Sequence, residues 1–244
     1  MQNVFETKGK PSVLELTCKS NTFAPCSFDV IVYDKQRLKS YYSRQNYLVS
    51  QAQKLTINLP VTPNKIGVQV EPVNFDLQLF EIKPEIKPLA TLSKGLSPEV
   101  YGFMKWAKWF CINASILPDK IYYQQPKGKY YINYMPVIVD DQFGEQITPA
   151  RIHNKTNEIQ VAADYFMPLS IPSRMVVMAH EISHNIWKND EEFVPDQSAC
   201  EICKMLGYTP EQIWDGFEEF MIDTPLNRER KKLIYNTLFI NGKT

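Results

Sequence analysis

The stretch from Met175 to Trp187, MVVMAHEISHNIW, constrains the fold of this 244-residue chain more than any other. Its first half is an almost unbroken apolar run, and Pro172-Ser173 just before it supplies a turn and an N-cap. The run therefore predicts a helix that is buried nearly all round. Polar side chains inside such a helix need partners, because an unpaired polar group costs much free energy there.

The polar side chains of this helix include His180, Glu181 and His184, which form the pattern His-Glu-x-x-His. Residues four apart lie on one helix face, so the two imidazoles are placed as two ligands of a tetrahedral Zn²⁺. Glu181 lies about 100° round the helix, beside the metal and not among its ligands. A carboxylate there can take a proton from a water that Zn²⁺ has acidified to a pKa of roughly 7. The spacing predicts a catalytic zinc site.

The segment resembles the zincin metallopeptidases, and its downstream part is similar to the gluzincin pattern Glu-x-x-x-Asp. Glu192 and Asp196 match that pattern, and Ala199 follows where the family often has a small residue. The resemblance covers residues 171 to 208. It implies a zincin-like metallopeptidase lobe with Glu192 as the third zinc ligand and Asp196 as the residue that hydrogen-bonds a ligand histidine.

The third ligand has more than one candidate. Seven residues separate His184 from Glu192, which is fewer than in most members of the group. If the two helices form a tight hairpin, the residue opposite the metal is Asp196 instead. Asp190 has the spacing of metzincin-like proteins, but these need a glycine where this chain has Trp187. Asp190 is therefore rejected, and Glu192 and Asp196 both remain candidates.

Residues 1–83 show the pattern of β-strands. Five runs largely alternate apolar with polar residues, which is typical of strands with one buried face. The runs are Ser12–Thr17, Phe28–Tyr33, Lys54–Leu59, Ile66–Val70 and Phe75–Phe80. Pro, Asn and Gly separate them, so we predict an antiparallel, β-sandwich-like domain. The stretch from Arg37 to Gln53 is a long loop or a strand pair.

A proline-rich linker is predicted at residues 84–95, because Pro84 and Pro88 remove backbone donors and stiffen the chain. Residues 96–244 then form the second domain. It begins with a helix signalled by Ser97-Pro98-Glu99, continues with strands from 120 to 163, and ends with the His-Glu-x-x-His helix and further helices. The charged run from Arg228 to Lys232 is interpreted as a solvated helix face. The chain is thus predicted to be α+β.

The family resemblance also implies a substrate-binding strand. In zincins the strand before the active helix lies at the cleft, and its edge pairs with an extended peptide. That strand would be 158–163 here, with four contact residues: Glu158, Ile159, Gln160 and Val161. Zincins often add a Tyr or His that stabilises the oxyanion, and Tyr165 is the candidate by position.

Composition excludes several classes of function. The charge is balanced, with 27 basic and 27 acidic residues, so no electrostatic argument favours nucleic acid or an anionic membrane as a partner. The N-terminus lacks the apolar core of a signal peptide, and no stretch approaches the roughly 20 apolar residues of a membrane span. We expect a soluble protein, cytoplasmic or part of a virion. Its five cysteines do not suggest a disulfide framework, and Cys200 and Cys203 are interpreted as core thiols.

These patterns predict a zinc metalloendopeptidase that hydrolyses a protein or peptide substrate, with Glu181 as the general base. One alternative is a structural protein, in which residues 1–83 dock onto a larger assembly such as a bacteriophage particle. The other is an intracellular regulatory protease that cuts one target. Co-purification in a high-mass particle favours the first alternative, and a free monomer that cuts one protein favours the second.

Overall fold

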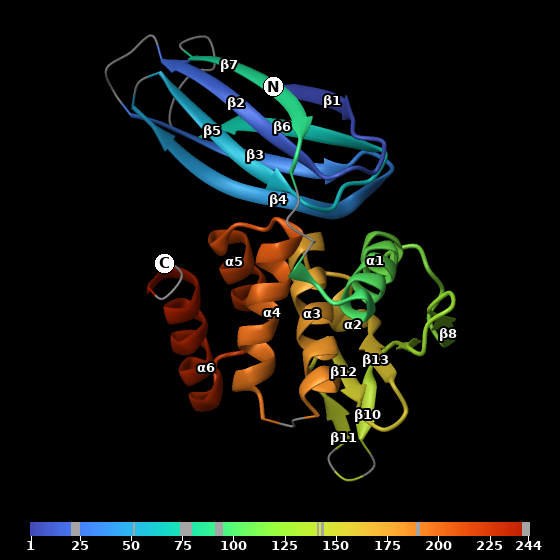
Figure 1. Ribbon diagram of the computed structural model, residues 1–244. Coiled ribbons are helices and arrows are strands. Elements are labelled where there is room, and N and C mark those ends of the chain that lie inside the picture. Colours follow the sequence, from blue (N-terminus) through green and yellow to red (C-terminus); the bar gives the residue numbers. More distant parts are fainter. Residues whose placement is uncertain are drawn as a thin grey trace. The chain divides into compact units, whose positions relative to one another are not determined.

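The computed structural model describes residues 1–20, 25–50, 52–73, 80–90, 95–140, 142, 144–188 and 191–240. The chain divides into two compact units, Met1–Thr91 and Leu92–Thr244. Figure 1 shows strands in the first unit, and helices beside a sheet in the second. The predicted α+β class is confirmed.

The first unit contains two antiparallel sheets, with strand orders β1-β6-β3-β4 and β5-β2-β7. Their bounds are β1 Gln2–Glu6, β2 Ser12–Ser20, β3 Cys26–Asp34, β4 Arg37–Val49, β5 Gln53–Leu59, β6 Lys65–Pro72 and β7 Phe80–Pro88. Alternate side chains are fully buried, such as Leu14 and Leu16 in β2 and Phe28 and Val30 in β3. Each sheet therefore buries one face.

The predicted strand runs coincide with β2, β3, β5 and β6. The run Phe75–Phe80 lies outside the described residues except for Phe80, where β7 begins. The stretch left open as a loop or a strand pair contains one long strand, β4. Strand β1 was not predicted, and it pairs with β6 at the edge of its sheet.

Residues 84–88, predicted as linker, belong to strand β7, which pairs antiparallel with β2. The backbone N–H of Leu89 donates to Pro11 O at 3.1 Å, on the β2 side. Because successive residues of a strand alternate, the nitrogens of Pro84 and Pro88 face the open side of this edge strand. A proline there costs no hydrogen bond of the sheet, which is why the two prolines do not end the strand.

The second unit contains a mixed four-stranded sheet in the order β12-β13-β9-β8 and a small ribbon, β10-β11. Its strands are β8 Ile121–Gln124, β9 Tyr131–Met135, β10 Ile138–Asp140, β11 Gly144–Gln146, β12 Ala150–His153 and β13 Glu158–Ala162. Its helices are α1 Pro98–Asn113, α2 Ala163–Phe166, α3 Ile171–Trp187, α4 Phe193–Leu206, α5 Pro210–Phe220 and α6 Pro225–Tyr235, and a π-helical segment Asn236–Ile240 follows α6. Among the described residues, no helix combines the length and apolar character that crossing a membrane requires.

Helix α3 lies at the centre of the second unit, where it contacts α1, α4, α5 and β12. Its residues are buried nearly all round, as predicted. The N-cap is Ser170, whose hydroxyl accepts a hydrogen bond from the N–H of Ser173, so the helix begins earlier than the predicted cap at Ser173. Pro172 lies in the first turn, where a missing N–H removes no helical hydrogen bond.

Arg174 is the fully buried charged side chain that holds α3 to its surroundings. Its guanidinium donates to the carbonyls of Phe166, Met167 and Leu169, in the segment before the helix. It also donates to Cys111 O, on α1, at 2.7 Å. Five guanidinium donors can satisfy several carbonyls at once, so the charge is paired with backbone dipoles although it lies in the apolar run.

We expect Gly102→Ala in α1 to stabilise the protein. A Cβ at this position would meet a single neighbouring atom, Gln125 Nε2, at 3.9 Å. Glycine in a helix interior is less favourable than alanine by about 1 kcal/mol, so the free energy of unfolding in urea should rise by up to that amount. Gly216→Ala in α5 is the contrasting variant, because its Cβ would lie 2.8 Å from Val176 Cγ2 and should destabilise. A loss of stability in Gly102→Ala would show that packing requires this glycine.

Candidate metal centre

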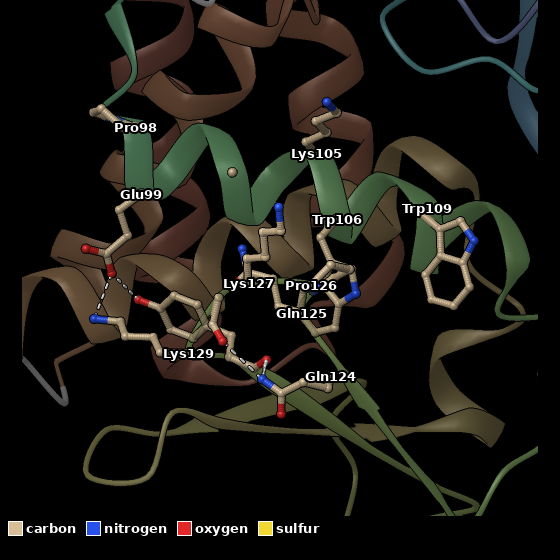
Figure 2. Close-up of a pocket in the computed structure, with 13 residues that line it drawn as sticks. Pro98, Glu99, Lys105, Trp106, Trp109, Gln124, Gln125, Pro126, Lys127 and Lys129 are labelled. Carbon is tan, nitrogen blue, oxygen red and sulfur yellow. Dashed lines mark hydrogen bonds and ion pairs between the residues drawn. The ribbon is translucent and has the colours of Figure 1, made fainter.

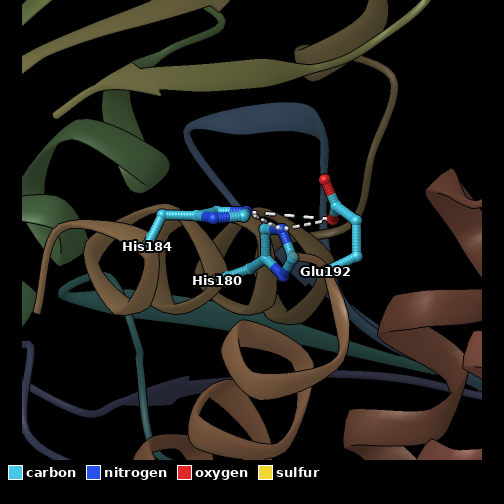
Figure 3. Close-up of side chains that lie close together, drawn as sticks. All are labelled: His180, His184 and Glu192. Atoms are coloured by element: carbon cyan, nitrogen blue, oxygen red, sulfur yellow. Dashed lines mark hydrogen bonds and ion pairs between the residues drawn. The ribbon is translucent and has the colours of Figure 1, made fainter. Parts of the chain in front are cut away.

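His180 and His184 lie on one face of α3, as the motif predicts. Their Nε2 atoms are 3.0 Å apart, and both residues are at most 9 % exposed. Figure 3 shows the two rings and the side chain of Glu192 directed toward one another. The helix therefore presents two imidazole nitrogens at one point.

Glu192 completes a group of three donor atoms. It lies at the N-cap position of α4, and its Oε2 is 3.2 Å from His180 Nε2 and 3.8 Å from His184 Nε2. Ligand atoms around a tetrahedral Zn²⁺ with ordinary bond lengths lie about 3.3 Å apart. Two imidazole nitrogens and one carboxylate oxygen at these separations form a group that can hold one metal ion, and they are ligand types that zinc commonly takes.

Asp196 lies on the other side of His180. Its Oδ1 is 2.9 Å from His180 Nδ1, the ring nitrogen that does not face Glu192, and its side chain is fully buried. A carboxylate at this nitrogen favours the tautomer that leaves Nε2 free for a metal. Of the two candidates for the third ligand, the geometry groups Glu192 with the imidazoles and places Asp196 behind one of them.

Arg230 of α6 is a site residue that sequence reasoning missed. Its Nε and Nη2 donate to the two carboxylate oxygens of Asp196 at 2.8 and 2.9 Å, and its Nη2 also lies 2.9 Å from Glu192 Oε2. The residue is 9 % exposed, so the interpretation of the Arg228 to Lys232 run as a solvated face is wrong at this position. Arg230 and Ile234 are four residues apart and therefore lie on the same face of α6, which is the buried face. The apolar Ile234 is the residue from which the sequence could have indicated this face.

In this cluster, neighbouring charges shift the pKa values of His180 and Glu192 in the opposite direction to burial. Burial disfavours the protonated form of His180, but Asp196 and Glu192 outweigh it and raise the pKa of the imidazole to about 10. Burial also disfavours the ionised form of Glu192, but the two histidines and Arg230 hold the pKa of its carboxyl far below the usual range. A metal that binds here must displace the proton from His180.

Glu181 is the buried carboxyl next to this group, and it is 6 % exposed. Burial raises its pKa, although the two neighbouring histidines lower it in part. It lines one cleft of about 370 Å³ together with His180, His184 and Glu192. A carboxyl with a raised pKa beside a reaction site is suited to accept a proton and hold it.

The strand that borders this cleft is β12, not the predicted β13. Strand β12 is the edge of the sheet and lines the cleft, whereas β13 pairs with β12 on one side and β9 on the other. The four predicted contact residues, Glu158, Ile159, Gln160 and Val161, therefore have no open edge for a peptide. The prediction failed because β12 has only four residues, too few for an alternating pattern to indicate a strand from the sequence alone.

The oxyanion candidate Tyr165 is not brought to the cleft. The hydroxyl of Tyr165 donates to Glu145 Oε1 at 2.8 Å, and the residue does not line the cleft. Asp190 lies outside the described residues.

The cysteines of α4 are fully buried free thiols. Burial raises the pKa of Cys200 to about 12 and the pKa of Cys203 well above its ordinary value. Such thiols are unreactive, which agrees with their interpretation as core residues.

Comparison of the chain with models of protein families, with curated proteins and with solved structures found no match. The chemistry of the site therefore rests on its geometry and on the sequence motif.

Proposed function

We propose that this chain is a zinc-dependent endopeptidase with a zincin-like second unit. The observation that carries the proposal is the meeting of two imidazole nitrogens and one carboxylate oxygen at zinc-ligand separations beside a buried glutamate. His180, His184 and Glu192 would hold the ion. When bound, Zn²⁺ acts as a Lewis acid toward the scissile carbonyl and acidifies water.

Glu181 performs the proton transfers of the proposed reaction. It takes a proton from the attacking water and passes it to the leaving amine. Burial favours its protonated form, so the carboxyl can hold the proton between the two steps. Asp196 and Arg230 act through His180, since they fix the orientation of its ring.

The proposed peptide-binding element is the edge of β12 that pairs with no strand among the described residues. The backbone N–H of Ile152 on this strand faces the carboxyl of Glu181, so the unpaired side of the strand is directed at the cleft. An extended peptide that pairs with this edge would pass beside the three donor atoms. The substrate class that follows is an unfolded or extended polypeptide segment.

The test combines metal content with proteolysis. The full chain, prepared without chelator and supplied with zinc, is expected to bind close to one equivalent by elemental analysis. It should cleave an unfolded protein such as casein, lose this activity in 1,10-phenanthroline and regain it when zinc is restored. Failure of the wild-type protein to bind zinc would overturn the metal centre. Zinc binding without cleavage of any unfolded protein would overturn the peptidase assignment alone.

A further inference from the structure

A second cleft, of about 1020 Å³, lies between α1 and the turn that joins β8 to β9. Its walls are formed by residues of α1 and by residues 124–130 (Figure 2). Strand β8 is the edge of the sheet opposite to β12, and none of the residues around the candidate metal centre lines this cleft. The volume lies at the upper end of the range for ligand sites in proteins.

One wall of the cleft is aromatic. Trp106 and Trp109 of α1 both line the cleft, and Figure 2 shows Trp106 beside Gln125 and Pro126, with Trp109 farther along the helix. The indole of Trp106 is almost buried, whereas Trp109 is 45 % exposed and its ring lies 6.2 Å from that of Tyr123. An exposed tryptophan in a concave site offers a flat apolar face on which an aromatic group can stack.

Gly102 keeps the middle of this wall free of side chains. Glycine lowers the stability of a helix interior, and a Cβ at this position would contact Gln125 Nε2 at 3.9 Å without a clash. The atom that a Cβ would approach belongs to Gln125, which lines the facing wall. The glycine thus costs helix stability at the position where a larger side chain would fill the cleft.

The charge of the cleft is positive. Its charged residues are Glu99, Lys105, Lys127 and Lys129. Glu99 is compensated, because Lys129 Nζ lies 2.8 Å from its Oε1 and the hydroxyl of Tyr130 donates to the same oxygen. Within the part of the chain that the structure describes, Lys105 and Lys127 have no carboxylate within 4 Å. Two uncompensated ammonium groups therefore border the cleft from opposite walls, in a chain whose net charge is zero.

Gln125 places a hydrogen-bond acceptor at the cleft that receives no hydrogen bond from the described residues. The residue is 8 % exposed, and its side-chain oxygen has no hydrogen-bond partner among the described residues. Its side chain packs over Gly128, where a Cβ would overlap it, so the amide is held at the cleft wall. A buried acceptor without a partner is unfavourable, and a ligand that carries N–H groups would relieve this cost.

We propose that this cleft binds an extended peptide segment in which acidic residues flank an aromatic residue. Carboxylates of the ligand form ion pairs with Lys105 and Lys127, and its aromatic ring stacks on Trp109. A backbone N–H of the ligand donates a hydrogen bond to the side-chain oxygen of Gln125. Nucleic acid fits less well, because two lysines neutralise few phosphates. The inference is independent of the proposed hydrolysis, since the cleft and the metal centre share no residue.

The test uses the immobilised full chain in EDTA, so that no peptide is cleaved. The probe is a degenerate peptide library with the pattern Asp/Glu-x-Phe/Tyr/Trp-x-Asp/Glu, compared with the same library carrying Asn/Gln in place of Asp/Glu. The acidic library should be retained about tenfold better than its amide counterpart, and the difference should shrink as salt is raised. Equal retention of the two libraries would overturn the proposal.

Variants of the cleft walls assign the retention to this site. The double variant Lys105→Glu/Lys127→Glu should lose the preference for the acidic library. The control Lys155→Glu/Lys232→Glu has the same change in net charge at exposed residues that do not line the cleft, and it should keep the preference. Gly102→Phe should abolish retention by filling the cleft.

Further outcomes would also contradict the proposal. They are full retention in Lys105→Glu/Lys127→Glu, equal loss in the control pair, and stronger retention of a single-stranded DNA oligonucleotide than of the acidic peptides. Binding by His184→Ala at the wild-type level would support the inference whatever the fate of the proposed peptidase activity.

Discussion

Glu181→Gln is expected to bind zinc as the wild type does and to hydrolyse peptides at least about a thousandfold more slowly, within the range that a lost general base produces. Glutamine has nearly the shape of glutamate, but its amide cannot accept a proton from water. The side chain lines the cleft beside the three donor atoms and does not belong to their group. A neutral amide also suits the site, because burial already disfavours the ionised carboxylate.

The measurement pairs elemental analysis with the initial rate of cleavage of an unfolded protein. His184→Ala is the contrasting variant, since it removes a donor atom and should lose both zinc and activity. Circular dichroism of each variant shows whether the fold is retained. Loss of zinc in a folded Glu181→Gln would overturn the assignment of Glu181 as the base, and retained activity would show that another group takes the proton.

The local features of the second unit could be predicted from the sequence. The apolar run of α3 and the spacing of His180 and His184 depend on the period of one helix. The helix starts at Ser97 and Thr209 were also predictable, because a capping side chain bonds a backbone N–H within the same turn. These features need no knowledge of what the element packs against.

The predictions that were wrong concern features that depend on contacts with residues distant in the sequence. Strand β13 appeared as the cleft edge because nothing in Ala150–His153 marks a strand until β12 pairs with it. Arg230 appeared solvated because its partners, Asp196 and Glu192, lie on another helix. The prolines of β7 appeared to end the domain because their side of the sheet was unknown. The choice between Glu192 and Asp196 likewise required the relative position of α3 and α4.

We expect Glu192→Ala to affect mainly zinc binding and Asp196→Asn to affect mainly the free energy of unfolding. Glu192 has a side chain that is 34 % exposed, so its loss should cost the metal-free protein less stability than the loss of the charge on the fully buried Asp196. It supplies one of the three donor atoms, so zinc should be lost from Glu192→Ala after dialysis against buffer. Asp196→Asn keeps all three donors, and loss of a residue that orients a ligand typically weakens metal binding about 10- to 100-fold.

Asp196→Asn should lose more stability than Glu192→Ala. Asp196 is fully buried against Arg230, and removing one charge of a buried pair costs about 3–5 kcal/mol because the other charge is left uncompensated. The neutral isostere keeps part of the hydrogen bonding, so the loss should lie toward the lower value. Zinc titration and urea unfolding of both metal-free variants measure the two effects. Zinc retained by Glu192→Ala and lost by Asp196→Asn would make Asp196 the third ligand, and the 3.2 Å contact of Glu192 with His180 would then be an ion pair only.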